Sequence, residues 1–117
     1  MIFVTGGTGL VGSHILLRLS QDRKPFKALK RPSSSLSICE KVFLEYNQAD
    51  LFRKINWVDG DINDISLLEI EIEGCDYVLH CSGLVSFHSS DIELLKKVNI
   101  EGTANMMNVA LNSSVKK

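Results

Sequence analysis

The sequence predicts an α/β fold in which helices cover both faces of a parallel sheet. Two observations lead to this class. A glycine-rich turn joins an apolar strand at residues 1–4 to an amphipathic run at 10–19, and further short apolar runs alternate with helical patterns along the chain. Strands that are joined through helices pair in parallel, because such a connection crosses over one face of the sheet. The length of 117 residues allows one small domain with its own core.

The composition is ordinary for a globular protein, with 44% hydrophobic residues, 23% charged residues and a formal net charge of -1. This balance gives no indication of nucleic acid binding, and the basic residues at 23–31 are typical of a solvated surface. No segment resembles a signal peptide or a membrane span, so we expect no membrane association and a cytoplasmic location. Cys39, Cys75 and Cys81 are odd in number and lack C-x-x-C spacing, which predicts buried thiols and no metal site.

The turn after the first strand carries the strongest functional signal. Gly7, Gly9 and Gly12 form a G-x-G-x-x-G pattern, preceded by Gly6. Glycines permit the tight turn, a close approach of backbone to a diphosphate, and close packing of helix on strand. The free N–H groups at the start of the helix attract an anion. The segment therefore predicts a pyrophosphate-binding loop, with a turn that binds nothing as the alternative; the absence of a lysine after Gly12 excludes the other common phosphate loop.

Three further strands are predicted at residues 26–30, 55–58 and 76–80, giving the strand order 3-2-1-4. Helices are expected from residue 35 or 37 to 46 and from residue 63 or 64 past 68, whereas 49–54 has no clear pattern. A capping box formed by Ser90 and Glu93 predicts the start of the last helix, which carries an apolar stripe as far as residue 110. The fourth strand would have an unpaired outer edge, which predicts self-association or partial disorder near the C-terminus.

Residues at the ends of the strands suggest which ligand the sheet edge binds. Lys30 and Arg31 stand at the end of the second strand, where an NAD-binding protein carries an acidic residue. A guanidinium pairs with a 2′-phosphate, so the sequence favours NADP over NAD, with a solvated Arg31 as the alternative. Asp61 and Gly83 follow the third and fourth strands at the same edge, where a ligand would cross. His80, inside the fourth strand, is expected to be a hydrogen-bonded structural histidine.

Four motifs in this order resemble those of the extended short-chain dehydrogenase/reductases, the NAD-dependent epimerase/dehydratase group. They are TGGTGLVG at 5–12, GDI at 60–62, HCSG at 80–83 and VNIEGT at 98–103. The segment ALKRP at 28–32 looks most like the dihydroflavonol-4-reductase branch, whose members are often NADP-dependent carbonyl reductases. The resemblance covers nearly all of the chain. It implies a Rossmann-type doubly wound sheet, here its N-terminal part, and an NAD(P)-dependent oxidoreductase with a small-molecule substrate.

The resemblance also implies roles for individual residues. The pyrophosphate would be bound or lined by Gly6, Thr8, Gly9, Leu10, Val11 and Gly12, the 2′-phosphate by Arg31, the adenine by Asp61 and Ile62, and the ribose and diphosphate by Cys81, Ser82 and Gly83. Asn99 matches an asparagine that ties the last helix to the central strand. Ser82 stands where the family usually has alanine, and a hydroxyl of that size should fit.

The family's catalytic Tyr-x-x-x-Lys is not found in this sequence. Tyr46 and Tyr77 are followed four positions on by Asp50 and Cys81. Because that tyrosine donates the proton in the family's reaction, the resemblance implies that this chain alone is inactive, and no catalytic residue is assigned. Three alternatives remain open at this point: an NAD-dependent nucleotide-sugar epimerase or dehydratase, a non-catalytic dinucleotide-binding module, and a partial fold that binds nothing.

Overall fold

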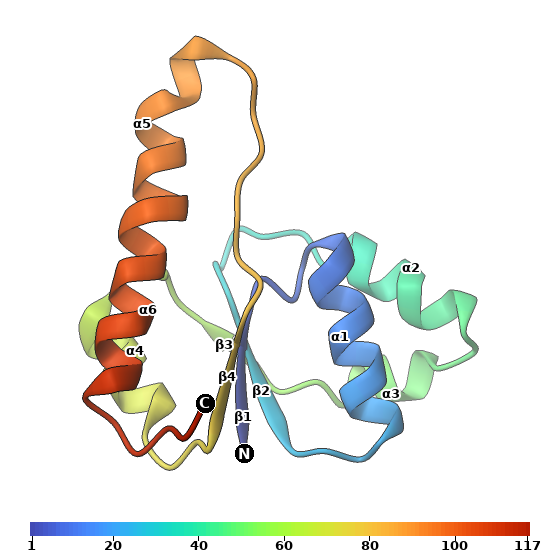
Figure 1. The fold of residues 1–117 in the computed structure, drawn as a ribbon. Coiled ribbons are helices and arrows are strands. Elements are labelled where there is room, and N and C mark those ends of the chain that lie inside the picture. Colours follow the sequence, from blue (N-terminus) through green and yellow to red (C-terminus); the bar gives the residue numbers. More distant parts are fainter.

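The protein folds around one four-stranded parallel sheet, as described for all residues 1–117 by the computed structural model. The strands are β1 (Ile2–Thr5), β2 (Phe26–Lys30), β3 (Trp57–Asp59) and β4 (Tyr77–His80). They lie in the order β3-β2-β1-β4, and each neighbouring pair is parallel. This order puts β1 and the glycine turn that follows it in the middle of the sheet (Figure 1). The predicted fold class and strand order are confirmed.

Helices cover both faces of the sheet (Figure 1). One face carries α1 (Leu10–Gln21), α2 (Ser37–Glu45) and α3 (Ala49–Arg53), and the other carries α4 (Ile65–Ile72) and α6 (Gly102–Leu111). A short 3₁₀ turn, η1 (Ser89–Asp91), leads into α5 (Ile92–Leu95), and a π-helical segment, η2 (Lys96–Glu101), joins α5 to α6. In Figure 1 this long helical arm extends well beyond the sheet. None of the helices has the length and apolar character needed to cross a membrane.

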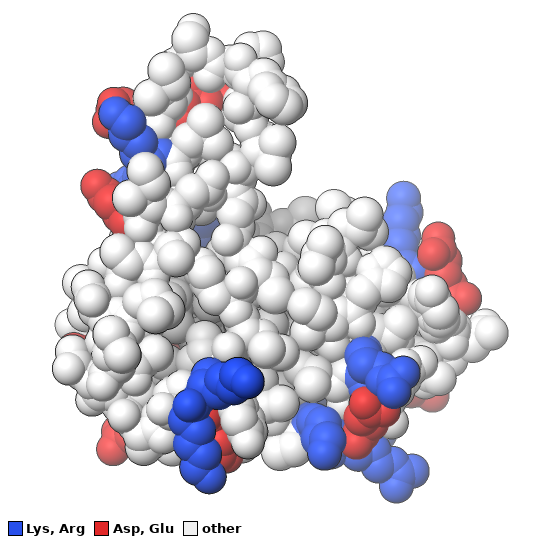
Figure 2. All heavy atoms as spheres, viewed as in Figure 1, with Lys and Arg blue, Asp and Glu red and all other residues white.

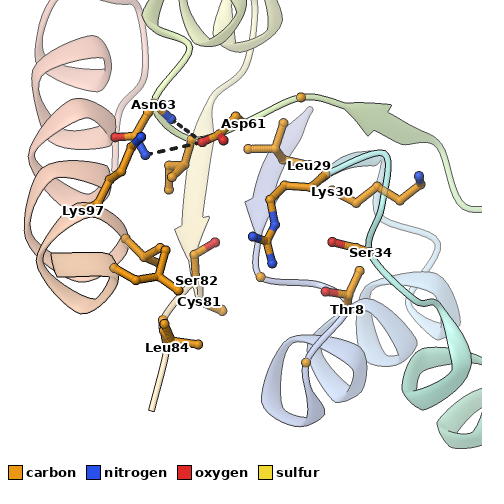
Figure 3. A pocket seen from close by; sticks show the side chains of 18 residues that line it. Thr8, Leu29, Lys30, Ser34, Asp61, Asn63, Cys81, Ser82, Leu84 and Lys97 are labelled. Carbon is orange, nitrogen blue, oxygen red and sulfur yellow. Dashed lines mark hydrogen bonds between the residues drawn. The ribbon is translucent and has the colours of Figure 1, made fainter. Parts of the chain in front are cut away.

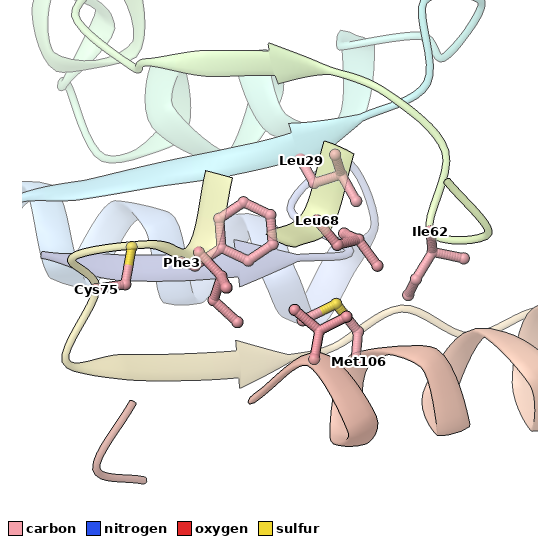
Figure 4. Packing of buried hydrophobic residues seen from close by; sticks show 8 residues of the cluster. Phe3, Leu29, Ile62, Leu68, Cys75 and Met106 are labelled. Carbon is pink, nitrogen blue, oxygen red and sulfur yellow. The ribbon is translucent and has the colours of Figure 1, made fainter. Parts of the chain in front are cut away.

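Two hydrophobic clusters hold the layers together, one on each face of the sheet. Side chains alternate between faces along a strand, so Phe3 and Val4 enter different clusters, as do Leu29 and Ala28. Phe3 and Leu29 pack with α4 and α6, as Figure 4 shows. Val4 and Ala28 pack with α1 and α2. Buried apolar residues on both faces are the pattern that a parallel sheet requires.

The predicted capping box at Ser90 and Glu93 is wrong. No side-chain cap is present at η1 or α5, because Ser90 lies within the 3₁₀ turn η1. Glu93 instead lies 3.7 Å from the Lys96 ammonium. Close to the start of this helix, the Ser86 hydroxyl donates a hydrogen bond to the Asp91 carboxylate at 2.6 Å. Residues 49–53, where the sequence showed no clear pattern, form the short helix α3.

The outer edge of β4 is partly covered by the last residues of the chain. The Lys116 N–H donates to the Asp76 carbonyl at 2.7 Å, and the Val78 N–H donates to the Lys117 carbonyl at 2.9 Å. The prediction of a wholly unpaired edge is therefore wrong for this part of the strand, because the chain's own backbone supplies two hydrogen bonds there. Self-association through the rest of the edge stays a prediction.

Candidate functional site

The glycine turn places unpaired N–H groups at the carboxyl edge of the sheet. Gly6 has a left-handed φ of +76°, and the Gly9 N–H donates to the Gly6 carbonyl at 3.2 Å. Helix α1 begins directly after Gly9, which offers no side-chain cap. The first helical hydrogen bond is that from the Ser13 N–H to the Gly9 carbonyl at 2.9 Å. The N–H groups at the start of α1 are therefore free to bind an anion.

The turn packs directly against the end of β4. A Cβ atom on Gly6 would lie 2.5 Å from both the Cys81 carbonyl oxygen and the Ser82 nitrogen. Only glycine allows this approach, and it brings the predicted ribose and diphosphate residues next to the glycine turn. Burial raises the pKa of the Cys81 thiol, so this side chain is neutral near pH 7.

A chain of partly buried hydrogen bonds fixes the same two strand ends. The Thr5 hydroxyl lies 2.7 Å from His80 Nδ1, and His80 Nε2 lies 3.0 Å from the Thr103 hydroxyl on α6. The Ser82 N–H also points to the Thr5 hydroxyl, at 3.4 Å. His80 is therefore hydrogen-bonded on both ring nitrogens, as the sequence predicted for a structural histidine. Burial lowers its pKa, since nothing nearby compensates the cost of a buried charge.

The end of β2 carries two basic residues in different environments. Lys30 is mostly buried and its ammonium pairs with the Asp59 carboxylate at 2.6 Å. Arg31 is exposed and forms no ion pair within the chain. The Ser34 N–H donates to the Arg31 carbonyl at 2.9 Å, which turns the chain so that both residues line the same cavity. Arg31 and the Ser34 hydroxyl are thus available to an anion.

These features surround one cavity of about 350 Å³, a size in the range of small-molecule sites. Nine of the twelve predicted cofactor residues line it: Gly6, Thr8, Gly9, Arg31, Asp61, Ile62, Cys81, Ser82 and Gly83. The other three do not. Leu10 and Val11 are exposed on α1, and Gly12 is buried beneath the turn, where its hydrogen atom faces the Gly6 carbonyl. The backbone of these three residues contributes the start of α1.

The helical arm supplies a wall of the cavity that sequence reasoning missed. Leu94, Lys97 and Val98 line the cavity from α5 and η2. Figure 3 shows Lys97 extending towards Asn63 and Asp61, on the side of the cavity opposite Ser34 and Thr8. Like Arg31, Lys97 has no ion-pair partner in the chain. The i, i+3, i+4 spacing of the three residues was a signal for a shared face, although the sequence alone did not show what that face meets.

Asn99 anchors the arm to the segment that follows β4. Its amide oxygen accepts a hydrogen bond from the Leu84 N–H and its amide nitrogen donates to the Leu84 carbonyl, both at 2.8 Å. These two hydrogen bonds tie the helix to the segment that leaves β4. The resemblance implied a tie to the central strand, but in this structure the partner, Leu84, lies beyond the end of the outer strand β4. Beyond it, Val85 and Phe87 are 83% and 99% exposed, so the loop projects apolar side chains into solvent. The tip of the arm shows few charged atoms in Figure 2.

The residues present fit the adenosine and diphosphate parts of a dinucleotide. The free N–H groups at α1 and the unpaired cations Arg31 and Lys97 suit phosphate oxygens. The close approach at Gly6 leaves the turn without side chains where a diphosphate would lie. Asp61, an acceptor-only group, suits an amino group and not a phosphate.

Comparisons with known proteins agree with this geometry. Residues 2–117 match the model of the NAD dependent epimerase/dehydratase family. A protein of Synechocystis sp. named "Putative dihydroflavonol 4-reductase" is 30% identical over 115 residues, which are 98% of this chain and 30% of that protein. The sterol-4-alpha-carboxylate 3-dehydrogenase of Dictyostelium discoideum is 28% identical over 113 residues, 97% of this chain and 31% of that protein.

A solved structure is similar over the same length. The NAD-bound structure of a short-chain dehydrogenase/reductase superfamily protein from Agrobacterium tumefaciens superimposes with a TM-score of 0.74 at 26% identity, covering 98% of this chain and 30% of the other. The chain thus spans about a third of the length of the proteins it matches.

Proposed function

Because this chain belongs to the NAD dependent epimerase/dehydratase family, we propose that it is the dinucleotide-binding part of an oxidoreductase that reduces a carbonyl or oxidises an alcohol. The observation that carries this proposal is the cavity in which the start of α1, Arg31 and Asp61 meet at one sheet edge. When bound, the dinucleotide supplies hydride chemistry. The role of this chain is to hold the adenosine and diphosphate parts in a fixed place.

Each wall of the cavity has a proposed partner in the dinucleotide. The N–H groups at the start of α1 and the backbone near Gly6 hold the diphosphate, with Thr8 beside them. Asp61 and Ile62 contact the adenine, and Cys81, Ser82 and Gly83 lie along the ribose and diphosphate. Lys97 adds a positive charge from the helical arm. We include it among the proposed cofactor contacts because it lines the same cavity and has no carboxylate partner.

We propose NADP as the preferred cofactor. Asp59 already neutralises Lys30, so Arg31 is the free cation at the end of β2. Its guanidinium and the Ser34 hydroxyl offer donors to a 2′-phosphate. An exposed carboxylate at this position would have favoured the ribose hydroxyl of NAD instead. Asp59 is half of the Lys30 ion pair and therefore does not act as such a carboxylate.

The first test is a calorimetric titration of the chain with NADPH and with NADH, for wild type and Arg31→Ser. We expect wild type to prefer NADPH, and the variant to lose about 10–100-fold in NADPH affinity, the worth of a charge-assisted hydrogen bond. Its NADH affinity should change by less than about threefold. Arg53→Ser is the matched control, because Arg53 pairs with Asp50 on α3 away from the cavity.

Two results would redirect the proposal. Equal or reversed preference in wild type would favour the NAD-dependent nucleotide-sugar epimerase or dehydratase, the alternative that the family name itself supports. Binding without any catalysis by a longer reading frame would favour a non-catalytic dinucleotide-binding module. A chain that binds neither nucleotide would contradict the proposed function.

We propose that this chain by itself does not catalyse hydride transfer. Tyr46 packs edge-on against His14, with ring centres 6.2 Å apart, and Tyr77 begins β4 at the end of the strand remote from the cavity. Neither tyrosine lines the cavity. Under this proposal, the tyrosine that acts as proton donor in the family's reaction is neither Tyr46 nor Tyr77.

A further inference from the structure

Helix α6 contacts the turn that follows β3, at Ile62 and Asn63. Asn105 on α6 directs its amide nitrogen at two oxygens of the turn, the Asn63 side-chain oxygen at 3.1 Å and the Ile62 carbonyl at 3.4 Å. One helical turn earlier, Gly102 packs on Ile62, since a Cβ there would come within 2.8 Å of Ile62 Cγ2. The helix therefore fixes both the backbone and a side chain of this turn.

Asn63, which Asn105 positions, in turn hydrogen-bonds the Asp61 carboxylate. Its N–H donates to Asp61 Oδ1 at 2.9 Å, and its amide nitrogen donates weakly to the same oxygen at 3.4 Å (Figure 3). The amide of Asn63 is therefore used on both sides, its nitrogen facing Asp61 and its oxygen accepting from Asn105. Asp61 Oδ2 makes no hydrogen bond within the chain, although Asp61 lines the cavity. One oxygen orients the carboxylate and the other is free for a ligand.

The charge of the cavity indicates what that free oxygen binds. A carboxylate accepts hydrogen bonds and repels phosphate, whereas Arg31 and Lys97 in the same cavity attract it. In a ligand that carries phosphates and adenine, the group that suits Asp61 is the exocyclic amino group of the base. Hypoxanthine has a carbonyl oxygen in place of that amino group and would be repelled by the carboxylate.

We propose that Asn105 is a positioning residue for base recognition, which sets the Asp61 carboxylate through Asn63 so that it accepts a hydrogen bond from the amino group of adenine. The inference rests on the proposed dinucleotide binding and adds to it a residue that does not touch the ligand. Both neighbours of the Asn105 amide nitrogen are acceptors, so the nitrogen has to face them. An aspartate of the same shape would present an oxygen to two oxygens and push the turn away.

The test compares ADP-ribose with its hypoxanthine counterpart, IDP-ribose, by calorimetry on wild type, Asn105→Asp and Asn105→Ala. We expect wild type to prefer ADP-ribose by at least about tenfold. Asn105→Asp should reduce this preference to less than about threefold while changing the affinity for IDP-ribose by no more than about twofold. Asn105→Ala should fall between them. Asn108→Ala is the matched control, an exposed asparagine on the same helix whose side chain makes no hydrogen bond.

The outcomes separate this inference from the proposed function. Preservation of the tenfold preference in Asn105→Asp would overturn the inference and leave dinucleotide binding intact. An equal loss for both ligands, together with a lower melting temperature, would show a merely structural role and would also overturn it. If wild type bound neither ligand, the proposed function itself would fall, and this inference with it.

Discussion

Replacement of Gly12 by alanine is expected to abolish dinucleotide binding and to destabilise the fold. An added methyl group would overlap the Gly6 carbonyl oxygen and would lie 2.6 Å from the Gly6 carbonyl carbon and 2.9 Å from Gly7 Cα. All three atoms belong to the backbone of the glycine turn, so relief requires movement of β1 away from α1. Overpacking of this kind costs about 1–3 kcal/mol, and we expect the upper end because no side chain can move aside. Urea unfolding measures the loss.

The matched variant is Gly9→Ala. A methyl group on Gly9 would meet only the Gly6 carbonyl oxygen, at 3.6 Å, an ordinary van der Waals contact, and Gly9 has an unstrained φ of -84°. We therefore expect its free energy of unfolding to stay within about 0.5 kcal/mol of wild type. Its nucleotide affinity should nevertheless fall, because Gly9 lines the cavity where the diphosphate approaches. Wild-type stability in Gly12→Ala would refute the packing role assigned to that glycine.

The second large effect is expected at His80. Burial lowers its pKa, so the folded protein resists the protonation that the unfolded chain accepts below its pKa of about 6.5. The unfolded state then binds more protons, and stability falls as the pH decreases from about 6.5 towards the lower pKa of the folded state. Above that window this group contributes no slope. Thr5 is wholly buried, so its hydroxyl cannot donate a hydrogen bond to water when His80 Nδ1 becomes protonated and no longer accepts one.

The measurement is the free energy of unfolding between pH 5 and pH 8 for wild type and His80→Gln. We expect the variant to be less stable at pH 7.5 by about 1–3 kcal/mol, because it removes the imidazole partner of the buried Thr5 hydroxyl and of the partly buried Thr103 hydroxyl. Its loss of stability towards pH 5 should be smaller than that of wild type. His88→Gln, at an exposed position, should retain the wild-type slope. A wild-type slope in His80→Gln would assign the acid sensitivity to another group.

Much of the fold follows from local patterns in the sequence. The glycine turn, the alternation of apolar residues in β2, and the strand order were predictable because each rests on a few neighbouring residues and a general rule of parallel sheets. The family was also predicted correctly, since four short motifs in the right order are more specific than any of them alone. Asp64 caps α4 through the Leu67 N–H at 3.1 Å, as its position suggested.

Contacts between distant segments could not be predicted in the same way. Lys97 is 66 positions from Arg31 in the sequence, and only the tertiary fold puts both beside one cavity. The Ser90 capping box failed because its pattern gives no account of Ser86, whose hydroxyl bonds Asp91 across the 3₁₀ turn. The hydrogen bond from Asn105 to Asn63 likewise depends on how α6 packs against the turn after β3.

The π-helical segment η2 allows the helix that contains it to contact two different segments of the chain, which lie at different angles around the helix axis. A π-turn contains one residue more than an α-turn, so it offsets the helical phase of everything before it relative to everything after it. Within η2, Asn99 hydrogen-bonds Leu84 on one side of the helix. After η2, Gly102 and Asn105 contact the turn at Ile62 on another side. Deletion of one residue from η2 would restore the α-helical phase and rotate the arm by about 100° relative to α6. An insertion or deletion in η2 would therefore turn the projecting loop, together with the cavity wall formed by Leu94, Lys97 and Val98, relative to the contacts that Gly102 and Asn105 make with the turn at Ile62.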